Sequence, residues 1–105
     1  MGEVSIPAGA VSLEGILEVP ARARGVVVFS HGSGSGRHSP RNRYVAGELE
    51  KAGFGTLLLD LLTVEEDEDY DNRFDIPLLT DRLGDAVGFV ERNARTRDLP
   101  VGLFG

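Results

Sequence analysis

The sequence predicts an α/β fold in which an N-terminal β-hairpin joins a mostly parallel sheet that carries two helices. Residues 3–6 and 11–19 alternate apolar and polar side chains, which is typical of hairpin strands. Residues 25–29 and 54–60 form continuous apolar runs instead, which suit strands buried on both faces. A helical apolar pattern separates these runs, so they predict a βαβ unit.

The N-terminal elements have recognisable boundaries. The segment Pro7-Ala8-Gly9 is a turn signal between the hairpin strands, and a change of apolar phase near Gly15 predicts a bulge in the second strand. Ser39 and Pro40 are a helix cap and a first helical residue, and Gly53 ends the helix that they begin.

The C-terminal elements follow from a second amphipathic pattern. Apolar residues recur at spacings of three and four from Asp75 onward, which predicts a helix that ends near residues 95–97. Gly84 and Gly88 lie within it, and close packing against a neighbour would account for them. Residues 101–104 form the last strand.

Composition limits the classes of function. The chain has 105 residues and a net charge of −6, so we expect one domain that does not bind nucleic acid. No apolar run reaches the ~20 residues of a membrane span, and no basic and apolar leader opens the chain, which predicts a cytoplasmic protein without membrane partners. Cysteine is absent, so packing must supply the stability.

The acidic run at residues 65–71 lacks the spaced ligands and the glycine of a calcium loop. We therefore expect a solvated loop there and no metal site.

A glycine-rich loop carries the main chemical signal. Residues 30–36, Ser-His-Gly-Ser-Gly-Ser-Gly, directly follow a buried strand. Glycines there permit positive φ angles, which can turn successive backbone amides into one concavity that binds an anionic oxygen. Such amides can stabilise the oxyanion of acyl transfer.

With residues 31–43 and 57–62, the chain resembles the α/β-hydrolase superfamily, and within it the dienelactone-hydrolase-like branch. The resemblance covers nearly the whole chain and implies that residues 1–105 are the N-terminal half of a hydrolase domain, with strand order 1-2-4-3-5 and one helix on each face. It implies an ester, lactone or similar acyl substrate and an acyl-enzyme intermediate, without a cofactor. The nucleophile, acid and catalytic histidine would all follow residue 105, so this piece alone should not turn over substrate.

The resemblance also assigns site residues. The backbone NH of Ser33 would be one oxyanion donor, with Gly34 beside it and with His31 and Gly32 shaping the loop. Neither His31 nor His38 corresponds to the family's catalytic histidine.

The residues after the loop leave alternatives open. Arg37, Arg41 and Asn42 are candidates to bind a substrate carboxylate, although solvated charges at a helix start are equally consistent with this pattern. Asp60, at a strand end, would border the pocket or cap local backbone.

Two alternative functions come from other classes. The loop could bind a phosphate or nucleotide, but its G-x-G-x-G spacing differs from the dinucleotide fingerprint. The chain could also be a structural fragment that self-associates. In the family's sheet, Val101–Phe104 would be an open edge that pairs with a complementary C-terminal hydrolase half or with a second copy.

Overall fold

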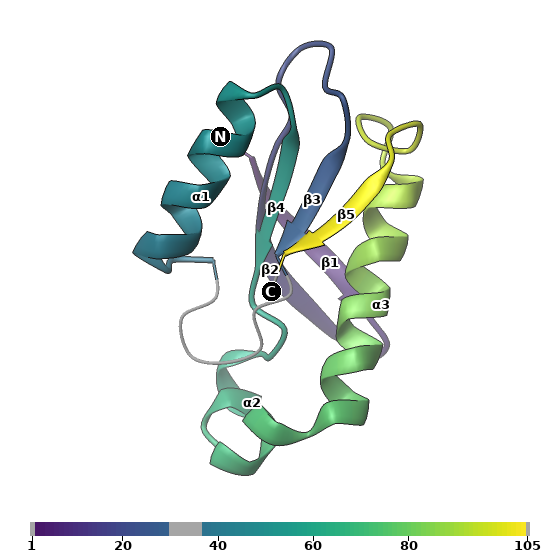
Figure 1. The fold of residues 1–105 in the computed structure, drawn as a ribbon. Helices are drawn as coiled ribbons and strands as arrows, with labels where there is room; N and C mark the ends of the chain where they lie inside the picture. Colours follow the sequence, from purple (N-terminus) through teal and green to yellow (C-terminus); the bar gives the residue numbers. More distant parts are fainter. Residues whose placement is uncertain (1, 30–36, 105) are drawn as a thin grey trace.

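The computed structural model describes residues 2–29 and 37–104, and the expected α/β architecture is confirmed (Figure 1). The five strands are β1 (Glu3–Ala8), β2 (Val11–Glu18), β3 (Val26–Phe29), β4 (Gly55–Leu59) and β5 (Val101–Phe104). The helical elements are α1 (Pro40–Lys51), α2 (Val64–Asp67), the 3-10 helix η1 (Tyr70–Phe74) and α3 (Ile76–Arg92). In these ranges, no helix has the length and apolar character that a membrane crossing requires.

The sheet has the predicted order β1-β2-β4-β3-β5. Strands β1 and β2 form the antiparallel hairpin, and β2 pairs antiparallel with β4. Strand β3 runs parallel to both β4 and β5. The carboxyl ends of β3, β4 and β5 therefore meet at one edge of the sheet, which is where open α/β sheets bind ligands.

The hairpin differs from the sequence prediction in one respect. Its register runs unbroken from Glu3↔Ile16 to Ala8↔Val11, so the expected bulge near Gly15 is wrong. Gly15 continues the buried face of β2 instead. A Cβ at Gly15 would lie 3.0 Å from the carbonyl oxygen of Leu58, so close backbone approach, not a change of phase, explains the glycine.

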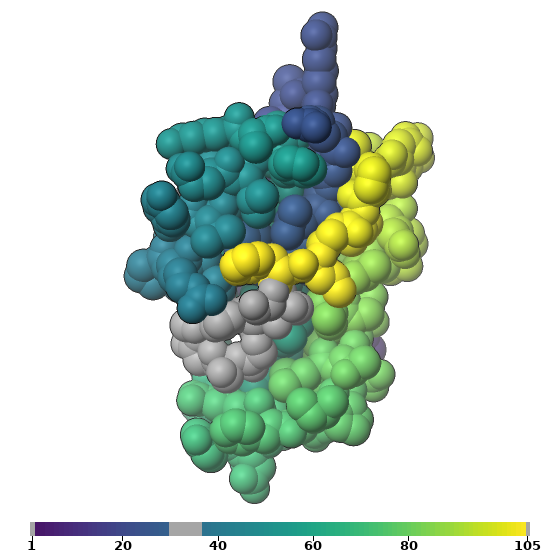
Figure 2. Space-filling model, in the orientation of Figure 1, coloured from purple at the N-terminus to yellow at the C-terminus, as the bar shows by residue number. Residues whose placement is uncertain are grey.

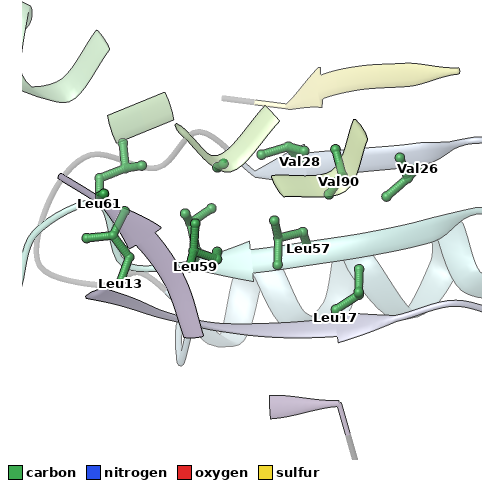
Figure 3. Close-up of a cluster of buried hydrophobic side chains, with 11 residues drawn as sticks. Leu13, Leu17, Val26, Val28, Leu57, Leu59, Leu61 and Val90 are labelled. Atoms are coloured by element: carbon green, nitrogen blue, oxygen red, sulfur yellow. The ribbon is translucent and has the colours of Figure 1, made fainter. Parts of the chain in front are cut away.

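The helices cover opposite faces of the sheet, as predicted (Figure 1). The larger core lies on the α3 face, where Val90 of α3 faces leucine and valine side chains of β2, β3 and β4 (Figure 3). The smaller core lies on the α1 face and contains Phe29, Ala46 and Leu58. Neighbouring residues of β4 thus enter different cores, which explains why that strand is apolar throughout.

Helix α3 is shorter than the sequence predicts, because it ends at Arg92 and Asn93 takes an extended conformation. Thr96 follows in the next turn and is buried, and its hydroxyl donates a hydrogen bond to the carbonyl oxygen of Val90. The expected close packing at Gly84 is also wrong, since a Cβ there would meet nothing within 4 Å. The atoms nearest to a Cβ at Gly88 would be those of the Arg92 guanidinium, the closest at 3.1 Å.

The acidic run is not a loop, because it folds into α2 and η1, although most of its side chains are exposed as its composition predicts. Thr63 and Glu66 form a capping box at the start of α2. Arg82 of α3 donates hydrogen bonds to both carboxylate oxygens of Glu66, at 2.7 and 2.6 Å, and to the carbonyl oxygen of Leu61. The hydrogen bonds from Arg82, together with those from Thr63, lower the pKa of Glu66 to about 2 although burial acts in the opposite direction.

Candidate functional site

The candidate site lies at the carboxyl edge of the parallel strands. Strand β3 ends at Phe29 and leads toward the glycine-rich segment, and β4 ends at Leu59, directly before Asp60. Phe29 pairs with Phe104 of β5, and their rings pack with centroids 5.1 Å apart. Two aromatic side chains thus pack together at the carboxyl ends of β3 and β5, next in sequence to the glycine-rich segment.

The predicted oxyanion residues His31, Gly32, Ser33 and Gly34 lie outside the described residues. Their assigned roles therefore stay predictions. What the structure does describe is how the chain enters this segment, through β3, and how it leaves it, through Arg37 and the start of α1.

Arg37 is paired within the protein. Its backbone N–H donates to Oδ1 of Asp60 at 2.8 Å, and its Nη1 donates to Oδ2 of the same carboxylate. Its Nη2 also lies 3.8 Å from Oε1 of Glu14 on β2. The backbone N–H that Asp60 binds belongs to a residue 23 positions away, so this is not the local cap that the sequence suggests, and a place for Asp60 at the border of the pocket stays a prediction.

Helix α1 begins with the cap that the sequence predicts. The backbone N–H of Asn42 donates to the hydroxyl of Ser39 at 3.3 Å, and Pro40 occupies the first turn. Asn42 is 2 % exposed, and among the described residues its side-chain Nδ2 finds no hydrogen-bond acceptor. Arg41 is exposed. A buried donor without a partner costs about 1–3 kcal/mol, so Asn42 is the more informative candidate for a ligand contact.

A hollow of about 360 Å³ lies beside Arg37, over the β1–β2 hairpin. It is bordered by Glu3, Val4, Ser5, Glu14, Gly15 and Arg37. Two of these side chains are carboxylates, so this hollow does not suit the substrate carboxylate for which Arg37 was a candidate. Across residues 2–29 and 37–104, no three His, Asp or Glu side chains are grouped as they would be around a metal ion.

Sequence reasoning missed the partner of Arg37 and the cluster around Glu66. The pair Arg37–Asp60 joins residues 23 positions apart, and Arg82–Glu66 joins residues 16 apart. No local pattern reports such pairs. The Thr63-x-x-Glu66 spacing of a capping box was present in the sequence and could have revealed α2.

Comparison with solved structures identifies the fold. A dienelactone hydrolase from Anabaena variabilis ATCC 29413 superposes with a TM-score of 0.91 at 52% identity, over 98% of this chain and 50% of that protein. Est1E from Butyrivibrio proteoclasticus superposes with a TM-score of 0.74 over 100% of this chain and 41% of its own, and at 15% identity it supports the fold alone.

Among curated proteins, two from Mycobacterium tuberculosis strains CDC 1551 and H37Rv are each 56% identical over 103 residues. Their names provisionally assign them as phosphoribosyl transferases. The match covers 98% of this chain and 23% of each relative, so the chain spans less than a quarter of their length. No family model matches the chain.

Proposed function

Because the chain has the fold of a dienelactone-hydrolase-like part of an α/β-hydrolase, we propose that it serves in an enzyme that cleaves ester, lactone or similar acyl bonds. The observation that carries this proposal is the 52% identity to the dienelactone hydrolase, at a TM-score of 0.91. The sheet order supports it, because β3 leads directly into the glycine-rich segment at the carboxyl edge.

The proposed mechanism gives this chain the oxyanion side of the site. The backbone NH of Ser33 stabilises the tetrahedral oxyanion, with Gly34 as its neighbour, while His31 and Gly32 shape the turn. The nucleophile, acid and histidine of an acyl-enzyme pathway come from the rest of the hydrolase domain. The chain alone is then unable to turn over substrate.

Asn42 and Arg41 are the proposed substrate contacts. The buried Asn42 amide has a donor to offer, and the exposed Arg41 lies one residue before it at the start of α1. Arg37, whose guanidinium already faces two carboxylates, is less suited to this role.

The edge strand β5 is the proposed contact with the rest of the domain. In the described part of the sheet it pairs with β3 alone, and its Leu103 is 57% exposed. Figure 2 shows β5, in yellow, crossing the surface of the molecule. Such an edge accepts another strand, from a complementary hydrolase half or from a second copy.

The test uses the full-length protein that contains this chain. We expect labelling by a fluorophosphonate probe and hydrolysis of a simple aryl ester. Ser33→Ala keeps the backbone amide and should retain near-normal kcat, whereas Ser33→Pro removes it and should lower kcat by ~100-fold or more. Equal activity in two variants with equal melting temperatures would refute the oxyanion role of Ser33.

A second candidate function is favoured by the names of the Mycobacterium relatives, which agree with phosphate or nucleotide binding by the glycine-rich segment. Because the match covers 23% of those proteins, their names need not describe the matched part. Phosphoribosyl diphosphate and a panel of nucleotides should leave the melting temperature of this chain unchanged if the hydrolase proposal is right. A saturable rise would favour the phosphate-binding function.

A further inference from the structure

We propose that Asp60 and Arg37 form a positioning pair that supports turnover. The pair fastens the residue that follows the glycine-rich segment to the carboxyl end of β4. This inference rests on the proposed hydrolase function. It assigns no contact with substrate to either residue, so neither is a catalytic residue.

The backbone of Asp60 is held in place by the sheet. Its backbone N–H donates to the carbonyl oxygen of Glu14 at 3.1 Å, which extends the β2–β4 pairing by one residue. Leu59 and Leu61 on either side are 1% and 4% exposed. The carboxylate therefore projects from backbone that is held both by the sheet and by the α3-side core.

The carboxylate makes two distinct bonds to Arg37. Oδ1 accepts the backbone N–H, a bond that does not depend on the side chain at position 37, and Oδ2 accepts from the guanidinium. The side chains of Arg37 and Asp60 are 21% and 31% exposed, so water screens this pair less than it screens a fully exposed one. Both carboxylate oxygens are thus used to hold a single residue.

Arg37 of this pair lies next in sequence to the glycine-rich segment that holds the proposed oxyanion donor. Arg37 is four residues after Ser33 and two before Ser39, whose hydroxyl caps α1. The connection from β3 to α1 is therefore anchored at Phe29 by strand pairing and at Arg37 by Asp60. Because a displacement of about 1 Å at a reacting centre can cost ~100-fold in rate, the second anchor should matter for turnover.

Matched variants distinguish the contributions of the two hydrogen bonds between Arg37 and Asp60. Arg37→Gln removes the guanidinium but keeps the backbone N–H. Asp60→Asn keeps one acceptor but loses the charge, and Asp60→Ala removes both acceptor oxygens. Glu48→Gln serves as the control, because it breaks an exposed ion pair with Lys51 in the last turn of α1. Each variant is made in the full-length protein and assayed for kcat, KM, melting temperature and fluorophosphonate labelling.

We expect kcat to fall about 10- to 100-fold in Asp60→Ala, less in Asp60→Asn and less than about 5-fold in Arg37→Gln, with KM changed less than about 3-fold. Glu48→Gln should match the wild type. Normal kcat in Asp60→Ala refutes the inference, and so does a change confined to KM. If Asp60→Ala does not fold, the same criteria apply to Asp60→Asn, whose kcat must then fall below that of Arg37→Gln.

Different results would refute the hydrolase function and the positioning role of the pair. A wild-type protein that neither labels with fluorophosphonate nor hydrolyses esters refutes the proposed function. A wild-type protein that does both, with unchanged kcat in the Asp60 variants, refutes only the positioning role.

Discussion

Replacing Glu66 with glutamine should destabilise the protein measurably at neutral pH. The Glu66 carboxylate accepts from the backbone N–H of Thr63 at 3.0 Å and from both terminal nitrogens of Arg82. Glutamine has the same shape and keeps an acceptor for the Thr63 amide, but it loses the charge that faces the guanidinium. The substitution therefore isolates the ion pair that joins α2 to α3.

The magnitude follows from the pKa of Glu66, which falls from 4.5 to about 2 chiefly through the hydrogen bonds from Arg82. A difference of about 2.5 units, at 1.36 kcal/mol each, sets an upper limit of about 3 kcal/mol. The Glu66 side chain is 25% exposed and that of Arg82 is 10% exposed, so solvent screening reduces this value. We expect a loss of about 1–2 kcal/mol in the free energy of unfolding.

The pH dependence gives the sharper test. A carboxylate whose pKa is lowered by folding contributes its full stabilisation above its ordinary pKa, here 4.5, and loses it as the pH falls toward about 2. Urea unfolding of wild type and Glu66→Gln at pH 7, 5, 4 and 3 should show a difference of about 1–2 kcal/mol at pH 7. That difference should shrink steadily below pH 4.5.

Glu65 supplies the matched control, because it is the exposed neighbour of Glu66 on α2. Glu65→Gln changes the net charge by the same amount, and we expect less than about 0.5 kcal/mol of effect. Equal stability of the two glutamine variants at pH 7 would contradict a stabilising ion pair between Glu66 and Arg82. So would a stability deficit of Glu66→Gln that persists unchanged at pH 3.

Substitutions at three further sites should change the stability measured by urea unfolding. Gly84→Ala should raise the free energy of unfolding by about 1 kcal/mol, since the site is helical with open space around it. Gly53→Ala should lower the free energy of unfolding by about 1–2 kcal/mol, because the φ of +94° at Gly53 is strained for alanine. Equal effects of alanine at Gly84 and Gly53 would contradict this conformational explanation. Thr96→Val should lower the free energy of unfolding by about 1–3 kcal/mol, because it removes the hydroxyl that donates to the Val90 carbonyl oxygen. Thr96→Ser retains this hydroxyl and should lower it distinctly less, whereas equal losses in the two variants would assign the effect to packing.

The sheet was predictable because its signals are local. The runs at residues 25–29 and 54–60 could not alternate, since their strands lie between two cores. Ser39 and Pro40 fixed the start of α1 for equally local reasons. The strand order came from resemblance to a known family, and the observed pairing agrees with it.

The sequence predictions were wrong where contacts between distant segments, and not local composition, determine the structure. Seven residues with six acidic side chains favour a solvated loop, but Arg82 supplies a cation from α3 that the run itself lacks. No neighbour lies close enough to Gly84 to require a glycine there, and a sequence alone does not distinguish a tolerated glycine from a required one. The end of α3 depended on Asn93 turning into extended backbone, which the apolar spacing does not register.

The charges at the sheet edge bear on the kind of substrate that suits the proposed site. Arg37, a cation beside the end of β4, faces the carboxylates of Asp60 and Glu14, so it has little charge left to offer an anionic acyl group. The buried side-chain donor that finds no partner among the described residues is neutral, the Asn42 amide. A neutral donor discriminates by hydrogen bonding and shape, because a ligand without an acceptor would leave it unpaired at a cost of about 1–3 kcal/mol. We therefore expect Asn42 to favour a neutral ester or lactone carbonyl, and any selection for a charged group to come from Arg41 or from residues elsewhere in the domain.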